Sequence, residues 1–407
     1  MSKIYLDHAA TTPLEPKVLK TMLPYFSEKF GNPMSVHSFG QEAVEAVDNA
    51  RARIADFFGA SPSEIIFTSG ATESNNLTIN GIIRAYYSVA HKNNERPHII
   101  TTKLEHHCVL NACKTVEKDR WAQVSYIAPD KEGIISIQDI EKNIQPNTIL
   151  VSVMYVNNEI GTVQPIEEIG KMLKKINAER AKKNLTRIFF HTDATQAVNY
   201  FDCNVNKLAV DLLSMSGHKI YGPKGVGLLY IRKGTPIKRI QEGGEQEFSL
   251  RAGTHNVPGI VGLAEAISAI NNDQQPKISK KIQALRDYLI KKVLEEIPNS
   301  YLNGSAEKRS PNNANFRFDN VEGEGLVLSL DMEGIAASTG SACSSGTLEP
   351  SHVLLSLGLK HEQAHGSLRI TLGKNTTKGE INVLIKKLKE IVERLRKISG
   401  NVLSEFK

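Results

Sequence analysis

Short apolar runs rich in β-branched residues recur along the first part of the chain and alternate with helical or loop segments. We interpret six of them as strands: EIIFTS (64–69), HIITT (98–102), TILVSVMYV (148–156), RIFFHTD (187–193), DLLSMS (211–216) and GVGLLYI (225–231). Strands that alternate with helices are typical of a mostly parallel sheet covered by helices. The pattern therefore predicts an α/β fold for this part of the chain.

The pattern changes after AGTHNVPG (252–259), where longer helical periods begin. Three helices are expected, at IVGLAEAISAI (260–270), KISKKIQALRDYLIKKVLEEI (277–297) and the terminal KGEINVLIKKLKEIVERLRKI (378–398). The apolar runs ANFRFD (314–319), GLVLSLD (325–331) and SLRITLG (367–373) lie between the last two helices. We interpret this part as a second, α+β domain, with NNDQQPK (271–277) as the weakest linker candidate.

The composition is that of an ordinary globular protein, with 407 residues, 40% hydrophobic and 23% charged. This length is enough for a large core and for two or three domains. No run approaches the roughly 18 apolar residues of a membrane span, and Asp7 and His8 precede any apolar run of signal-peptide length. Four cysteines are too few for a disulfide framework and favour a reducing compartment, so a cytoplasmic protein is expected.

The net charge of +6 reflects lysine-rich stretches such as KMLKKINAERAKKN (171–184). Their basic residues are spaced as on a helix with apolar residues between them, and no aromatic residues interleave with them. We therefore interpret them as solvated helix faces, and direct nucleic-acid binding is not expected.

Polar residues follow three of the expected strands. Thr72 lies where the first strand passes into a helix, and the unpaired N–H groups of a helix start favour an anion such as phosphate, although a simple N-cap is the common alternative. Asp193 ends the fourth strand, where side chains of a parallel sheet meet a ligand. Lys219 follows the fifth strand between Gly217 and a glycine-rich turn. It is either a surface lysine or a desolvated amine nucleophile.

An anion site, a strand-end carboxylate and a strand-end lysine together match what pyridoxal 5'-phosphate requires. The lysine would form a Schiff base, the carboxylate would keep the pyridine nitrogen protonated, and the helix start would hold the phosphate. The three weak signals support one another, so the sequence predicts this cofactor.

Cys343 stands in AASTGSACSSGTLEP (336–350), a run of small and polar residues in which no core is built. A thiol tucked under a tight turn is one interpretation. The other is an exposed thiol, because a run rich in serine and glycine is typical of a surface loop.

The chain resembles the cysteine desulfurases of the NifS/IscS-like group, within the class-V aminotransferase-like family of fold-type I pyridoxal-phosphate enzymes. The motifs that carry the resemblance span nearly the whole chain: YLDHAATTP, FGNPMSVH, FTSGATESNN, LEHHCVL, VNNEIGTVQPI, HTDATQA, SGHKIYGPKGVG, RAGTHN, STGSACSSGTLEPSHVL and SLRITLG. The resemblance implies a large domain (15–260) with a mostly parallel seven-stranded sheet flanked by helices. A smaller α+β domain (1–14 and 261–407) would carry the catalytic-cysteine loop (about 336–350).

The resemblance also implies a role for each matching residue. Lys219 would bind the cofactor covalently, His106 would stack on its ring and relay protons, and Cys343 would accept the sulfur. Arg369, helped by Asn157, would bind the substrate carboxylate. The residues expected to contact the cofactor are Ala71, Thr72, His106, Asn157, Asp193, Gln196, Ser216, His218, Lys219 and, from the partner subunit of a homodimer, Thr254.

The implied activity removes sulfur from L-cysteine, leaves L-alanine, and places a persulfide on Cys343 for transfer to an acceptor protein. Such acceptors serve iron–sulfur cluster assembly or tRNA thiolation. A selenocysteine lyase and a non-catalytic scaffold of the same fold are the alternatives.

Two further segments, residues 105–108 and 243–254, call for separate comment. No metal site is expected at EHHC (105–108), and we interpret His107, Cys108, Cys113 and Cys203 as packing residues. In GGEQEFSLRAGT (243–254), Glu245 and Ser249 stand where the resemblance leads us to expect glycine, which leaves the shape of this inter-subunit loop open.

Overall fold

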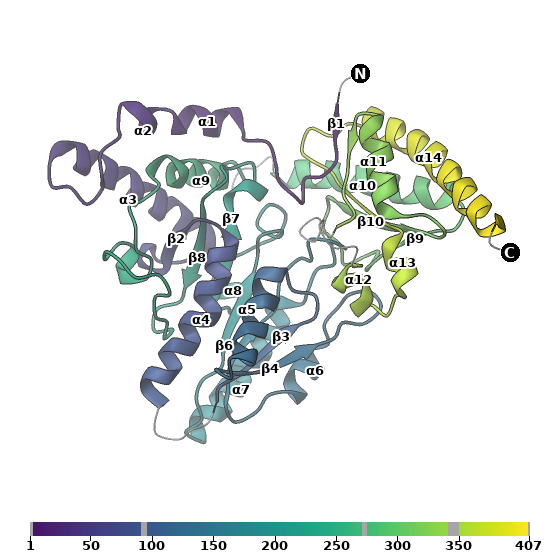
Figure 1. Ribbon diagram of the computed structural model, residues 1–407. Coiled ribbons are helices and arrows are strands. Elements are labelled where there is room, and N and C mark those ends of the chain that lie inside the picture. Colours follow the sequence, from purple (N-terminus) through teal and green to yellow (C-terminus); the bar gives the residue numbers. More distant parts are fainter. Residues whose placement is uncertain (1–2, 91–95, 271–274, 341–349, 406–407) are drawn as a thin grey trace.

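A seven-stranded sheet forms the larger part of the molecule (Figure 1). The computed structural model describes residues 3–90, 96–270, 275–340 and 350–405, and Cys343 lies outside these ranges. Within them the sheet has the order β2-β8-β7-β6-β5-β3-β4, in which β8 is antiparallel to both of its neighbours and the other pairs are parallel. Its strands are β2 (Ile65–Thr68), β3 (His98–Thr102), β4 (Gln123–Ile127), β5 (Thr148–Ser152), β6 (Phe189–Asp193), β7 (Leu212–Ser216) and β8 (Gly227–Ile231).

Six strands fall within the predicted runs, and β4 does not. Edge strand β4 begins at the exposed Gln123, and only its last residue, Ile127, is buried. Its sequence therefore lacks the continuous apolar character that marks a strand buried on both faces.

Helices cover both faces of this sheet. Helices α3 (Ser38–Phe58), α7 (Ile166–Lys182) and α9 (Val257–Ile270) contribute to one hydrophobic core, and α4 (Ala71–Ala90) and α5 (His107–Lys118) contribute to another. Neighbouring strand residues alternate between the two cores, since Ile65 and Phe67 lie in the first and Ile66 in the second. The shorter helices of this part are α1 (Pro16–Met22), α2 (Pro24–Ser27), α6 (Ile137–Lys142) and α8 (Val205–Leu208).

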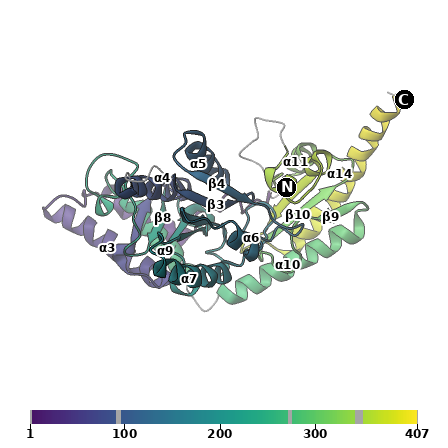
Figure 2. The same cartoon turned by 90° about the horizontal axis from the view of Figure 1, so that it is seen from below.

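The C-terminal part has its own core and two small sheets. An antiparallel sheet has the order β12-β10-β9, and a parallel pair joins β1 to β11. The strands are β1 (Ile4–Tyr5), β9 (Ser300–Leu302), β10 (Asn313–Phe318), β11 (Ile335–Ala336) and β12 (Ser367–Thr371). The helices are α10 (Gln275–Glu296), α11 (Gly323–Met332), α12 (His352–Ser356), α13 (His361–His365) and α14 (Lys378–Glu405), and α10 and α14 lie on the side away from α3 (Figure 2). The run GLVLSLD is part of α11.

Helix α9 belongs to the larger part, although the sequence placed residues from 261 on in the smaller domain. It packs against α1 and α3, and Leu263 and Ile267 are buried in the core beneath the large sheet. The helix is apolar on nearly all sides, which is the pattern of a helix buried within a core. We place the domain boundary after α9.

The N-terminal segment connects the two parts. Residues 4 and 5 pair with β11, and the backbone N–H of Thr12 then donates to the carbonyl of His218, just after β7 (2.9 Å). None of the helices in the described part of the chain is long and apolar enough to cross a membrane.

Candidate active site

A cavity of about 580 Å³ is lined by residues that follow β2, β3, β5, β6 and β7, by the N-terminal segment, and by Gly340 and Arg369 of the smaller part. This is the edge at which open α/β sheets bind ligands, and the volume suits a cofactor together with a small substrate. The predicted site residues that line it are Ala71, Thr72, His106, Asp193, Gln196, Ser216, His218, Lys219 and Arg369.

One end of the cavity is suited to an anion. The turn after β2 places Ser69 and Gly70 before the first residues of the 20-residue helix α4, whose unpaired N–H groups and positive dipole end favour negative charge. Gly70 has a φ of 153°, and a Cβ on the neighbouring Gly227 would lie 2.6 Å from the Gly70 Cα. Glycine is therefore required at position 227, where β8 approaches this turn.

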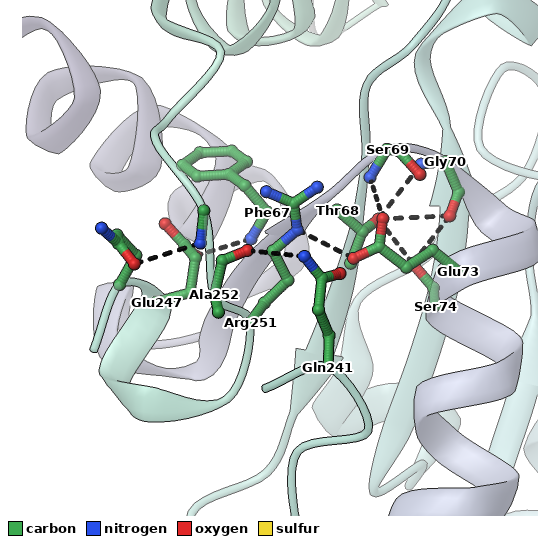
Figure 3. A network of polar contacts seen from close by, with 12 residues as sticks. Phe67, Thr68, Ser69, Gly70, Glu73, Ser74, Gln241, Glu247, Arg251 and Ala252 are labelled. Atoms are coloured by element: carbon green, nitrogen blue, oxygen red, sulfur yellow. Dashed lines mark hydrogen bonds and ion pairs between the residues drawn. The ribbon is translucent and has the colours of Figure 1, made fainter. Parts of the chain in front are cut away.

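The titratable side chains discussed at the anion end of the cavity are either neutral or balanced by an ion pair. Burial lowers the pKa of His218 to about 4, so this imidazole is neutral at pH 7. Burial alone would raise the pKa of Glu73, but hydrogen bonds from Arg251 and Ser69 lower it below its usual value. Arg251 Nε lies 2.9 Å from Glu73 Oε1 and thus balances this carboxylate (Figure 3).

Asp193 is fixed at the end of β6 by two donors. The amide of Asn75 donates to its Oδ2 (2.7 Å), and the backbone N–H of Thr195 donates to its Oδ1 (2.9 Å). A carboxylate in this position, only 6% exposed, is suited to a cationic ring nitrogen.

Lys219 lies in the short turn Gly217–Lys219 that follows β7. Its amine donates to the carbonyl oxygens of Ala9 and Ala10, at 2.5 Å each. The N-terminal segment therefore holds the amine inside the cavity.

Arg369 is presented by β12 and is 3% exposed. Its guanidinium donates to Asp7 Oδ1 (2.8 Å) and to the carbonyl of Asn158 (2.9 Å). Within the part of the chain that the structure describes, its Nε has no hydrogen-bond partner. A buried arginine with a donor left over is suited to bind a carboxylate.

His106 caps the N-terminus of α5. Its Nδ1 accepts from the backbone N–H of Cys108 (3.2 Å). Burial lowers its pKa, with a smaller opposing effect of Asp193. The preceding Glu105 is fully buried, and burial raises its pKa to about 8. Its Oε1 accepts a hydrogen bond from the backbone N–H of Met154 (2.8 Å), which stabilises the turn before α5.

Two predicted residues do not line the cavity in the described part of the chain, and a third, Cys343, is not among the described residues. Asn157 is buried in a turn, where its amide donates to the Leu104 carbonyl (2.9 Å), and its neighbour Asn158 lines the cavity instead. Thr254 does not line the cavity of its own chain, and Cys343 lies outside the described residues. The roles given to these three residues stay predictions.

Cys108 is the residue for which the sequence analysis was incomplete. Cys113 and Cys203 are buried in cores as expected, but Cys108 lines the cavity, with its Sγ 3.0 Å from His106 Nδ1. Asn75 joins it from α4. The sequence places Asn75 three residues after Thr72 and Cys108 two residues after His106, but the contact between Asn75 and Cys108 joins two helices and has no local signal.

The loop 241–254 has an unusual left-handed turn. Glu247, Phe248 and Ser249 have φ values of 49°, 56° and 63°. Glu247 holds the turn, because its buried carboxylate accepts from both terminal nitrogens of Arg51 (2.6 and 2.8 Å) and from the backbone N–H of Phe67 (2.7 Å; Figure 3). The loop thus keeps its shape without the glycine expected at position 249.

Comparison with known proteins agrees with this architecture. The model of the aminotransferase class-V family matches residues 4–384. A cysteine desulfurase IscS from Dictyoglomus turgidum is 48% identical over 397 residues, which cover 98% of this chain and 96% of the relative.

Solved structures lead to the same group. A NifS-like protein superposes with a TM-score of 0.86 at 35% identity, covering 96% of this chain and 99% of the other. A structure described as SspA in complex with cysteine superposes with a TM-score of 0.77 at 37% identity, covering 92% of this chain and 100% of the other. The fold is that of the class-V aminotransferases, as the sequence predicted. The chain therefore belongs to the aminotransferase class-V family, in its NifS/IscS-like cysteine desulfurase group.

Proposed function

We propose that this chain is a pyridoxal-phosphate-dependent cysteine desulfurase that forms alanine and a protein-bound persulfide. One observation carries the proposal: a single cavity holds an anion site, a buried carboxylate, an amine and a buried arginine with a donor left over. These are the groups that a phosphorylated cofactor and an amino-acid substrate require.

The residues present fit the cofactor. Thr72, Ser216 and His218 would hold its phosphate at the start of α4, Asp193 would face its ring nitrogen, and Lys219 would attach it. When bound, pyridoxal phosphate supplies a ring that accepts electrons from the substrate. The protein keeps Asp193 oriented through Asn75 and Thr195 and keeps the Lys219 amine inside the cavity through the N-terminal segment.

Arg369 would recognise the substrate carboxylate. Its guanidinium is already oriented by Asp7 and by the Asn158 carbonyl, so little side-chain freedom is lost on binding.

Cys343 would take the sulfur. Its thiolate would attack the substrate sulfur, so that an S–S bond forms as the Cβ–S bond breaks, and Cβ gains a proton to give alanine. Burial raises the pKa of Cys108 to about 12 and raises those of Cys113 and Cys203 as well, so these thiols are poor nucleophiles at pH 7. The persulfide would pass to an acceptor protein, for iron–sulfur cluster assembly or tRNA thiolation, in the cytoplasm.

We further propose a homodimer, in which Thr254 of each chain completes the phosphate site of the other. Exposed large apolar side chains concentrate between residues 19 and 39, and Val36 is 92% exposed. An apolar surface of this kind needs a partner, and the second chain would cover it.

The test is the position of the transferred sulfur. After brief exposure to L-cysteine, mass spectrometry of the purified protein should find one additional sulfur on Cys343. Cys343→Ser should bind the cofactor and release alanine at less than about one hundredth of the parent rate, because a hydroxyl is a far weaker nucleophile toward sulfur than a thiolate.

Matched controls separate the four cysteines. Cys113→Ala and Cys203→Ala should retain the persulfide and cost only packing energy. Additional sulfur on Cys108, Cys113 or Cys203, or undiminished alanine release by Cys343→Ser, would contradict the proposal.

A further inference from the structure

A chain of polar contacts links Asp193 to His106 through Asn75, so far assigned only to orient Asp193, and through Cys108, to which the proposed reaction gives no role. The Nδ2 of Asn75 lies 2.7 Å from Asp193 Oδ2 and 3.1 Å from Cys108 Sγ. Cys108 Sγ in turn lies 3.0 Å from His106 Nδ1. The contacts join α4, α5 and the end of β6, and Asn75 is fully buried.

The direction of each hydrogen bond follows from the chemistry of the groups. The Asp193 carboxylate only accepts, so Asn75 must present its NH2 group to it, and the second amide hydrogen is then directed to the Cys108 sulfur. The reverse amide orientation would place two oxygens 2.7 Å apart. Since the sulfur accepts from Asn75, the thiol hydrogen is available to donate to His106 Nδ1.

His106 Nδ1 is an acceptor for a second reason. The backbone N–H of Cys108 also points at it, at 3.2 Å. A ring nitrogen that accepts cannot carry a proton, so a neutral His106 must carry its proton on Nε2.

We propose that Asn75 and Cys108 are positioning residues that hold His106 as the neutral imidazole protonated at Nε2. The inference concerns the protonation of this chain's own residues, and its use in catalysis rests on the proposed function. In that reaction His106 would donate a proton from Nε2 rather than begin as a base at that atom.

Other groups near His106 act on the same equilibrium. Burial is the main effect and lowers the pKa of His106, and Asp193 on β6 opposes it. Lys219 after β7, His107 on α5 itself and His352 on α12 each lower it further. The thiol of Cys108 adds a donor to Nδ1, which stabilises the neutral ring over the charged ring.

The test is nuclear magnetic resonance of the full-length protein labelled with ¹⁵N-histidine, with cofactor bound and again without it. The signals of His106 are assigned by their absence from His106→Gln. The Nδ1 signal should be that of an unprotonated nitrogen at pH 7. In Cys108→Ala the pKa of His106 should rise by about half a pH unit, because a donor to the neutral form is lost.

Two variants separate positioning from packing. Cys108→Ser keeps a donor at this position and should restore a pKa close to that of the parent. Cys113→Ala removes a buried thiol elsewhere on α5 and should leave it unchanged. A protonated Nδ1 in the parent, or the same His106 pKa in Cys108→Ala and the parent, overturns the proposal. Absence of a persulfide on Cys343 would overturn only the proposed function, since these signals do not depend on turnover.

Discussion

His191 shows how the sheet accommodates a titratable residue without charge. Its Nδ1 lies 2.8 Å from Ser152 Oγ and its Nε2 lies 3.0 Å from Ser214 Oγ, so both ring nitrogens have partners on neighbouring strands. His98 lies between two hydroxyl groups in the same way. Burial lowers the pKa of both residues to about 4.

These histidines predict a loss of stability in acid. Each binds a proton in the unfolded chain near pH 6.5 but in the folded chain only near pH 4, so the unfolded state binds more protons between these values. The free energy of unfolding should therefore fall as the pH drops from 6.5 to 4, by about 1.4 kcal/mol per pH unit for each such histidine. Urea unfolding at several pH values measures how steeply the free energy of unfolding changes with pH. This slope is proportional to the number of protons taken up on unfolding, and His191→Gln should lower that number by about one. An unchanged slope in that variant would assign the acid sensitivity to other groups.

Arg369 carries a prediction about substrate affinity. Arg369→Ala removes the proposed carboxylate partner and leaves Asp193 and Lys219 in place. The KM for L-cysteine should rise about 30- to 100-fold, as expected for loss of a charged hydrogen bond, while cofactor absorbance is retained. The measurement is alanine formation against cysteine concentration, and an unaltered KM would remove Arg369 from the substrate site.

At the scale of elements, the loop 241–254 is the segment where backbone conformation and residue type conflict most clearly. Three consecutive residues without the freedom of glycine have a positive φ, and the buried ion pair of Glu247 with Arg51 holds them there. Each of them forgoes the conformation that a side chain prefers.

Ser249→Gly should therefore stabilise the protein. Because glycine adopts a φ of 63° without strain, the free energy of unfolding should rise by about 0.5 to 1 kcal/mol, measured by thermal or urea unfolding. Ser356→Gly, at a helical position of α12, is the matched control and should destabilise by a similar amount. A destabilised Ser249→Gly would mean that the hydroxyl contributes more than the strain costs.

Elements with a strong hydrophobic pattern were predictable from the sequence, and contacts between elements were not. Six strands of the large sheet were predicted from apolar runs, whereas β4 at the edge was missed because it is polar at one end. Thr72, Asp193 and Lys219 were predicted because each lies at the end of a strand or a few residues beyond it. Asn75 and Cys108 come into contact only when α4 and α5 pack together, and no local sequence pattern predicts a contact of this kind.

At the scale of the whole molecule, the exposed apolar segment is the feature that a single chain does not explain. Phe30 and Phe39 are 64% and 51% exposed, with their ring centroids 5.6 Å apart. Their side chains are large enough to anchor an interface.

Phe30→Glu should weaken the proposed homodimer. A carboxylate in an apolar interface costs several kcal/mol, so light scattering should show monomer at micromolar concentrations where the parent is a dimer. Leu328→Glu is the control, since Leu328 on α11 is equally exposed, at 66%, and lies outside the segment. A monomeric parent that holds its cofactor tightly would contradict the dimer.

The N-terminal segment has a consequence for the order in which the protein is made. Residues 4 and 5 pair with β11, Asp7 contacts Arg369, and the carbonyls of Ala9 and Ala10 hold Lys219. Within this chain, residues 4–7 are synthesised well before two of their partners, β11 and Arg369. The large sheet has all its strands by residue 231 and is free to fold earlier. A nascent chain that has reached residue 231 can therefore carry a folded sheet while its cavity still lacks Gly340 and Arg369, and we expect it to gain these groups only after β12 has been synthesised.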